Sequence, residues 1–206
     1  MTSEPSVEVR TERLRLRRIT EGELPAWHLQ VFSDPEVMRY LPSGVPVPMA
    51  RTREVFRQVE EAWGRRGFGP WGVEIADTGA LAGHCGLREV EELPGEVEVL
   101  YALGREHWGR GYATEAARAS VRFGFDRLGL ERVLAFAVPA NVPSRRVMEK
   151  MGMVYERRAR LFGIETVVYR LDRDRFDPAN ARFEVAGGGA VVTPPASPRA
   201  RDPKAR

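Results

Sequence analysis

Hydrophobic and polar residues alternate one by one in several short stretches of this chain. Leu14 to Arg17 follows this period of two, and so do residues 69–77 and 80–93, which a turn at Asp77-Thr78-Gly79 separates. A fourth such stretch covers residues 96–103. The period is typical of β-strands with one buried face. The last three stretches, joined by short turns, therefore predict an antiparallel meander.

A period near 3.6 residues marks other stretches as helices. The clearest follows residue 111, where Ala113, Ala117, Val121 and Phe125 fall on one helical face. The order of elements predicts an α/β fold with a mixed sheet and helices on both faces. A doubly wound dinucleotide fold is disfavoured, because its early glycine fingerprint is missing. The other predicted elements are helices over 21–32, from Pro35, over 50–63 and over 142–151, and strands over 132–138, 153–162 and 164–171.

Composition divides the chain into three parts. We expect a flexible arm over 1–11, one folded domain over 12–176, and a disordered tail rich in Pro, Gly, Ala and Arg over 177–206. The formal net charge of +3 belongs to the tail, because four basic residues and one acidic residue lie within 193–206. A neutral body is weak support for a nucleic-acid groove. We therefore expect no nucleic-acid partner.

The sequence also predicts where the protein works. No apolar run approaches the roughly 18 residues that a membrane helix needs, and the N-terminus is too polar for a signal peptide. Cys85 is the single cysteine, which fits a reducing compartment and leaves no cysteine pair for a metal site. These features predict a cytoplasmic protein without a membrane partner or a metal. Cys85 and the histidines His28 and His84 lie in apolar settings that favour packing roles.

The segment from Glu98 to Glu115 carries the first functional signal. A predicted strand ends at the turn Gly109-Arg110-Gly111, and a helix rich in small residues begins at once. Unpaired backbone N–H groups and the positive end of the helix dipole meet at such a point, which suits a phosphate. An ordinary strand-to-helix connection is the alternative. The segment is not a P-loop, because no Lys-Ser or Lys-Thr pair follows the second glycine.

A second signal follows the strand over 132–138. Asn141 suits the N-cap of a helix, and Pro143 suits its first turn. Ser144 occupies the position where a reciprocal capping partner would be Glu or Gln. Its hydroxyl therefore suggests another use.

Together these segments resemble the GNAT superfamily of N-acyltransferases, in its RimJ/RimL-like branch. The resemblance covers roughly Glu12 to Phe176. Two positions depart from the usual pattern: Trp108 replaces the Gln or Arg of the general motif, as is usual in this branch, and Met153 replaces a Phe. The stretches that carry the resemblance are TERLRLRRIT, EVEVLYALGREHWGRGYATEA and NVPSRRVMEKMGM.

The resemblance implies an acyl-CoA site between two splayed strands of a mostly antiparallel sheet. The pyrophosphate would bind to backbone amides of the glycine turn, and Asn141 would hold the pantetheine region. Arg110, Arg145 or Arg146 could screen the phosphates, although a solvated position is an equal alternative for each arginine. The cofactor-binding residues implied are Val99, Leu100, Tyr101, Trp108, Gly109, Arg110, Gly111, Tyr112, Ala113, Thr114, Asn141, Ser144 and Arg146.

Two residues are candidates for catalysis. Attack on a thioester needs a neutral amine, and at pH 7 about 1 in 7 α-amines is neutral, against about 1 in 2,500 lysine amines. The resemblance makes Glu98 the first candidate for the base, acting through water, with a solvent-facing charge as the alternative and Glu96 as the fallback. The tyrosine that protonates the thiolate in many relatives is replaced by Met148. Members of the RimL-like branch carry a serine at the position of Ser144, so the resemblance assigns the thiolate hydrogen bond to Ser144.

The sequence leaves the acceptor open. The resemblance implies transfer of an acetyl group from acetyl-CoA to a primary amine, by direct attack in a ternary complex. The amine is a protein N-terminus or a small molecule, and Trp27, Phe32 and Tyr40 are expected to line its pocket, with core packing as the alternative. A larger acyl donor such as succinyl-CoA, a non-catalytic acyl-CoA-binding module and a homodimer are also left open.

Overall fold

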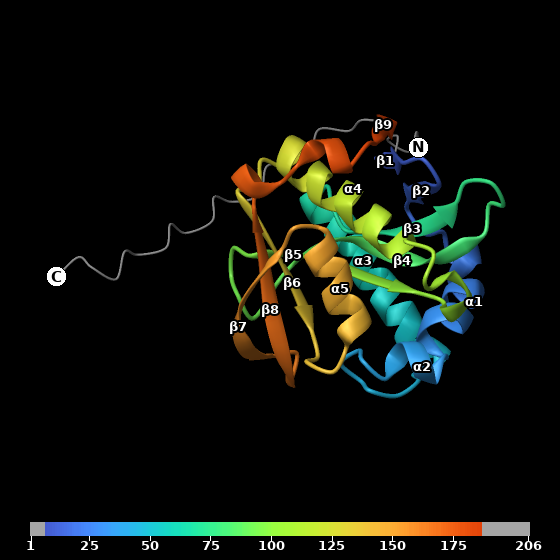
Figure 1. The fold of residues 1–206 in the computed structure, drawn as a ribbon. Helices are drawn as coiled ribbons and strands as arrows, with labels where there is room; N and C mark the ends of the chain where they lie inside the picture. The colour runs from blue at the N-terminus through green and yellow to red at the C-terminus, as the bar shows by residue number, and fades with distance from the viewer. Residues whose placement is uncertain (1–6, 187–206) are drawn as a thin grey trace.

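The computed structural model describes residues 7–186, and its nine strands form one sheet. The strand order is β7-β8-β6-β5-β4-β3-β2-β1-β9, and only β5 and β6 pair in parallel (Figure 1). The mixed, mostly antiparallel sheet and its β3-β4-β5 meander confirm the expected α/β fold. The strands are β1 (Glu8–Arg10), β2 (Leu14–Arg17), β3 (Pro70–Ile75), β4 (Leu81–Glu89), β5 (Val97–Leu103), β6 (Arg132–Ala137), β7 (Val154–Leu161), β8 (Ile164–Asp172) and β9 (Glu184–Ala186).

The helices lie where the periodicity predicts them, with one difference. The stretch 21–32 is divided into a 3₁₀ turn (Glu21–Glu23), α1 (Leu24–Trp27) and a π-helical segment (His28–Phe32). Reciprocal bonds between Thr20 and Glu23 form a capping box at the start of the 3₁₀ turn, in which the Thr20 N–H donates to Glu23 Oε2 at 2.8 Å. No helix within residues 7–186 is both long and apolar enough to cross a bilayer. The remaining α-helices are α2 (Pro35–Met38), α3 (Met49–Arg66), α4 (Tyr112–Arg127) and α5 (Val142–Lys150), and further 3₁₀ turns cover Arg105–His107, Arg173–Arg175 and Pro178–Asn180.

Helices cover both faces of the sheet. Helices α4 and α5 pack on one face, whereas α1 packs on β4 from the other face and contacts α3 (Figure 1). Alternate residues of a strand point to opposite faces. Val99 and Tyr101 of β5 therefore belong to the core beneath α4, whereas Ala102 belongs to the core beneath α1. Cys85 is buried with its Sγ 3.6 Å from Ser120 Oγ, and burial raises the pKa of its thiol to about 12, as suits a packing role.

Both ends of the described chain add strands beyond residues 12–176. Strand β1 lies within the expected arm 1–11 and pairs with β2, and β9 lies within the expected tail 177–206 and pairs with β1. Sequence periodicity gave no signal for these strands, because three residues are too few to show a period and β9 depends on pairing with β1 at the other end of the sequence. The rest of the expected arm and tail, residues 1–6 and 187–206, lies outside the described residues.

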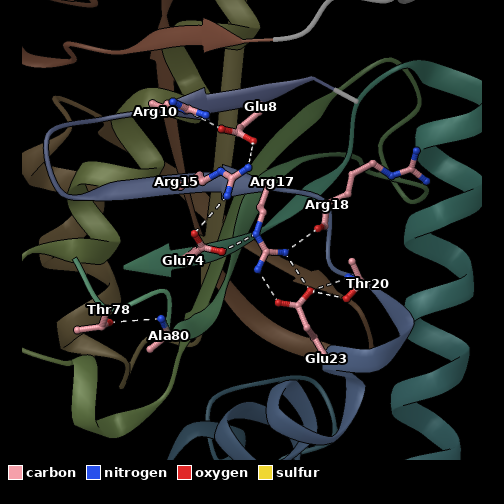
Figure 2. Close-up of polar contacts among 10 residues, drawn as sticks. All are labelled: Glu8, Arg10, Arg15, Arg17, Arg18, Thr20, Glu23, Glu74, Thr78 and Ala80. Atoms are coloured by element: carbon pink, nitrogen blue, oxygen red, sulfur yellow. Dashed lines mark hydrogen bonds and ion pairs between the residues drawn. The ribbon is translucent and has the colours of Figure 1, made fainter. Parts of the chain in front are cut away.

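A chain of ion pairs crosses β1, β2 and β3 on the polar face of these strands. Figure 2 shows Arg15 between Glu8 and Glu74, and Arg17 between Glu74 and Glu23. The Arg17 guanidinium lowers the pKa of Glu23 to about 2. Each arginine of the alternating LRLR stretch is therefore matched by a carboxylate, while Leu14 and Leu16 are buried on the opposite face.

Candidate active site

The candidate site lies where β5 and β6 separate. Within the described residues a single register pair, Glu98 with Leu134, joins these two parallel strands. Further along, β5 is connected to the segment after β6 by the hydroxyl of Tyr101 instead of a backbone ladder. The strands thus splay toward their carboxyl ends, as the resemblance implied.

The glycine turn presents free backbone amides at the N-terminus of α4. Gly109 and Gly111 have φ of 73° and 82°, which strongly favour glycine. Among residues 7–186, no side chain caps the N-terminus of this helix. The N–H of Glu115 donates to the Gly111 oxygen at 3.0 Å, whereas no acceptor is found among the described residues for the N–H groups of residues 109–114. A side chain at Gly109 would meet open space. These features fit a pyrophosphate, which needs donors and close approach.

The side chains expected around this turn differ in whether they are free to contact a phosphate. Trp108 is fixed by its indole N–H, which donates to the Leu103 oxygen at 2.7 Å, and the residue is 45% exposed. Arg110 and Arg146 are exposed. Arg145 is directed elsewhere, because its Nε donates to the Tyr169 hydroxyl at 3.2 Å. Of the three candidate arginines, Arg110 and Arg146 therefore suit the phosphate rim better.

A pair of hydroxyl groups lies at the start of α5. Asn141 caps this helix, its Oδ1 accepting the Ser144 N–H at 3.2 Å, as the sequence predicted. The Tyr101 hydroxyl donates to the Ser144 carbonyl at 2.9 Å and lies 3.0 Å from Ser144 Oγ. Burial raises the pKa of Tyr101, so its phenol stays protonated at neutral pH. Met148, at the usual tyrosine position, is buried in the core.

Sequence reasoning missed this contact of Tyr101. It placed Tyr101 only beside the pantetheine arm and regarded the usual tyrosine as absent. The two residues are 43 positions apart, and only the parallel pairing of β5 with β6 brings them together. A tyrosine on β5 with a serine in the first turn of α5 was the one signal available.

Glu98 occupies the closed end of the splay and is buried. It is 4% exposed, so the solvent-facing alternative for this residue is wrong. Its Oε1 accepts from Arg88 Nε at 2.9 Å and from Arg88 Nη2 at 2.5 Å. Burial raises the pKa of Glu98, while Arg88 opposes that shift. The fallback residue, Glu96, is held instead by Arg132.

The expected acceptor residues lie mainly in a packed core. Trp27 is 1% exposed, and its indole N–H donates to His84 Nδ1 at 3.0 Å. The Phe32 ring stacks on His84 at a centroid distance of 6.1 Å. Burial lowers the pKa of His84 to about 4, so the imidazole accepts this bond in its neutral form. Tyr40 is half-buried under Arg39. The contacts of Trp27 and Phe32 are those of packing, the alternative that the sequence left open.

Known proteins resemble this chain in sequence and in fold. A family profile described as "Acetyltransferase (GNAT) domain" matches residues 13–154. An uncharacterised N-acetyltransferase of Bacillus licheniformis, p20, is 30% identical over 146 residues, which are 71% of this chain and 82% of that protein. The crystal structure of an acetyltransferase from Agrobacterium tumefaciens is 30% identical, with a TM-score of 0.68 over 81% of this chain and 94% of that one.

A more distant structure shares the fold. It is RimL, a ribosomal L7/L12 α-N-protein acetyltransferase in complex with coenzyme A, at 19% identity and a TM-score of 0.66, covering 80% of this chain and 97% of that one. The profile spans well over half of the chain and includes the glycine turn and the Asn141–Ser144 cap. The chain therefore belongs to the GNAT acetyltransferase family, whose members are acetyl-CoA-dependent acyltransferases.

Proposed function

We propose that this protein transfers the acetyl group of acetyl-CoA to a primary amine by direct attack in a ternary complex. One observation carries the proposal: a carboxylate and a hydroxyl pair lie on opposite faces of β5 at the splay. Glu98 faces away from α4, whereas Tyr101 contacts Ser144 on the α4 side. A thioester in the gap would thus have a base on one side and hydroxyl donors on the other.

The chain's residues divide the chemical work. The amides of residues 109–114 would hold the pyrophosphate, and bound acetyl-CoA supplies the electrophilic carbonyl carbon. Glu98 Oε2 takes the amine proton, directly or through water, because both bonds from Arg88 end on Oε1. The new N–C bond then forms as the C–S bond breaks. Ser144 Oγ donates a hydrogen bond to the departing thiolate, and the Tyr101 hydroxyl, which donates to the Ser144 carbonyl, keeps that residue in place.

The hydroxyl pair stabilises the thiolate without protonating it fully. A phenol with a pKa raised above its usual value of about 10 is a weaker acid than a thiol of pKa about 8.5. Complete transfer of the phenol proton would therefore be uphill. The thiolate can leave in this form, since a hydrogen bond to a charged acceptor is itself worth about 1.5–3 kcal/mol.

We infer that an α-amine or another weakly basic amine is the preferred acceptor. Burial raises the pKa of Glu98 while Arg88 opposes that rise, and an α-amine needs less help from such a base than a lysine amine does to become neutral. The α-N-protein acetyltransferase RimL supports a protein N-terminus by fold analogy. A small amine is the other acceptor class that this chemistry fits.

The direct test is acetyl-CoA-dependent thiol release, measured against a library of peptides and small amines. We expect turnover with at least one α-amine, and product mass increased by one acetyl group. A parallel series with succinyl-CoA tests the donor, and faster turnover there would reject acetyl-CoA. Tight acetyl-CoA binding without turnover on any amine would overturn catalysis and indicate a binding module.

A further inference from the structure

Arg13 lies in the turn between β1 and β2, far from the glycine turn in the sequence, and its side chain reaches that turn. Its Nη1 donates to the Arg110 carbonyl at 3.0 Å. Its guanidinium lies over the Tyr112 ring, 4.9 Å from the centroid. A side chain on Gly111 would come within 3.4 Å of Arg13 Nη2. The guanidinium is therefore packed directly against the turn that would bind pyrophosphate.

The bond to Arg110 fixes one peptide plane of the turn. In a trans peptide the carbonyl of one residue and the N–H of the next point in opposite directions. Arg13 draws the Arg110 carbonyl toward itself, so the Gly111 N–H is directed to the opposite side. This residue thereby sets the direction of an amide in the middle of the donor turn.

Arg13 also neutralises a carboxylate that would oppose an anion. Glu115 lies in the first turn of α4, close to the free amides. Its Oε2 accepts from Arg13 Nε at 2.7 Å, and its Oε1 accepts from the Arg13 N–H at 3.0 Å and the Thr11 hydroxyl at 2.6 Å. Both oxygens are thus held by the β1–β2 turn. A carboxylate left uncompensated there would repel a pyrophosphate.

We propose that Arg13 is a positioning residue for the donor, acting through the Arg110–Gly111 peptide and through Glu115. The inference rests on the proposed function, because it takes the pyrophosphate of acetyl-CoA as the ligand of the turn. It also gives the β1–β2 turn, outside the glycine motif, a part in donor binding.

Calorimetric binding of acetyl-CoA tests the inference. We expect Arg13→Gln to weaken binding about tenfold, as for a lost charge-assisted contact. Arg13→Gln/Glu115→Gln should recover about half of that loss on a logarithmic scale, because Gln still accepts from Thr11 while the repelling charge is gone. Arg15→Gln is the matched control: it removes a neighbouring arginine that bonds Glu8 and Glu74 instead of the turn, and binding should be unchanged (Figure 2).

A donor without the pyrophosphate separates positioning from folding. Turnover with S-acetyl-pantetheine should be the same in the wild type and in Arg13→Gln, because that donor does not reach the turn. Unchanged acetyl-CoA affinity in Arg13→Gln, a double variant no better than the single one, or an equal loss with both donors would overturn the inference. If Arg13→Gln does not fold, Arg13→Lys serves, with an expected weakening of about threefold because one ammonium cannot reproduce the fork of bonds. A folded wild type without affinity for acetyl-CoA would overturn the proposed function itself.

Discussion

The proposed donor side and the region expected to meet the acceptor are built from different parts of the chain. The donor side is mainly backbone: two glycines with positive φ, the free amides of residues 109–114 and a helix N-terminus. The region expected to meet the acceptor is instead a packed cluster of side chains, in which Trp27, Phe32 and His84 contact one another.

The difference explains what each side can recognise. Backbone amides are the same in every sequence, so a glycine turn identifies a phosphate with little dependence on its neighbours. A pocket made of side chains takes its shape from packing, and small changes there alter which amine fits. The donor could therefore be inferred, whereas the acceptor is left to experiment.

Blocking the donor turn should have the largest effect. Gly111→Val places a β-branched residue at φ 82° and fills the space beside Arg13, so acetyl-CoA binding measured by calorimetry should weaken about 100-fold or more. Gly79→Val is the matched control, because Gly79 has φ 68° in open space in the β3–β4 turn. It should bear similar strain yet bind normally. Unchanged affinity in Gly111→Val would remove the pyrophosphate assignment.

Removing the buried carboxylate should lower turnover at saturating substrates. Glu98→Gln should reduce kcat about 100-fold with little change in acetyl-CoA affinity. The base acts ionised and burial raises its pKa, so wild-type kcat should fall as the pH drops through that raised value, and the variant should lack this limb. Glu96→Gln, which removes a carboxylate paired with Arg132, should remain close to wild type. A variant Glu98→Gln with normal kcat would exclude Glu98 as the base.

The hydroxyl pair should have a smaller effect. Ser144→Ala and Tyr101→Phe should each lower kcat about tenfold, and together they should lose less than the product of the two, because both act on one thiolate. Tyr169→Phe is the control. The Tyr169 hydroxyl also contacts α5, through Arg145 and Glu149, but not Ser144, so this variant should keep full kcat. A large loss of acetyl-CoA affinity in Ser144→Ala would contradict the assignment to the thiolate.

A change of pH should alter the stability of the packed cluster formed by Trp27, Phe32 and His84. Folding lowers the pKa of His84 from 6.5 to about 4, so the unfolded chain binds a proton that the folded chain excludes. The stabilisation is complete above the unfolded pKa and is lost as the pH falls from there toward about 4. Urea unfolding should show about 2 kcal/mol lost between about pH 7.5 and about pH 5, and His84→Gln should lack that part. If the free energy of unfolding depended on pH equally in the wild type and in His84→Gln, His84 would not be the source of this loss.

The strands and helices were predictable because their signals are local. The alternation in Leu14 to Arg17 and the face formed by Ala117, Val121 and Phe125 depend only on neighbouring residues, and the structure contains both elements. The cap at Asn141 was predictable for the same reason. The pairing of Arg88 with Glu98 was not, since it depends on the register between β4 and β5.

By itself, the sequence determined the family, the glycine turn and the α5 cap, because each is written in consecutive residues. Only the tertiary structure decided that Tyr101 meets Ser144, that Glu98 is buried, and that Arg13 reaches the turn from 97 residues before Arg110. These contacts come from strand pairing and helix docking, which bring distant residues within hydrogen-bond reach. No local pattern encodes such distances, and the chemistry of the site depends on them.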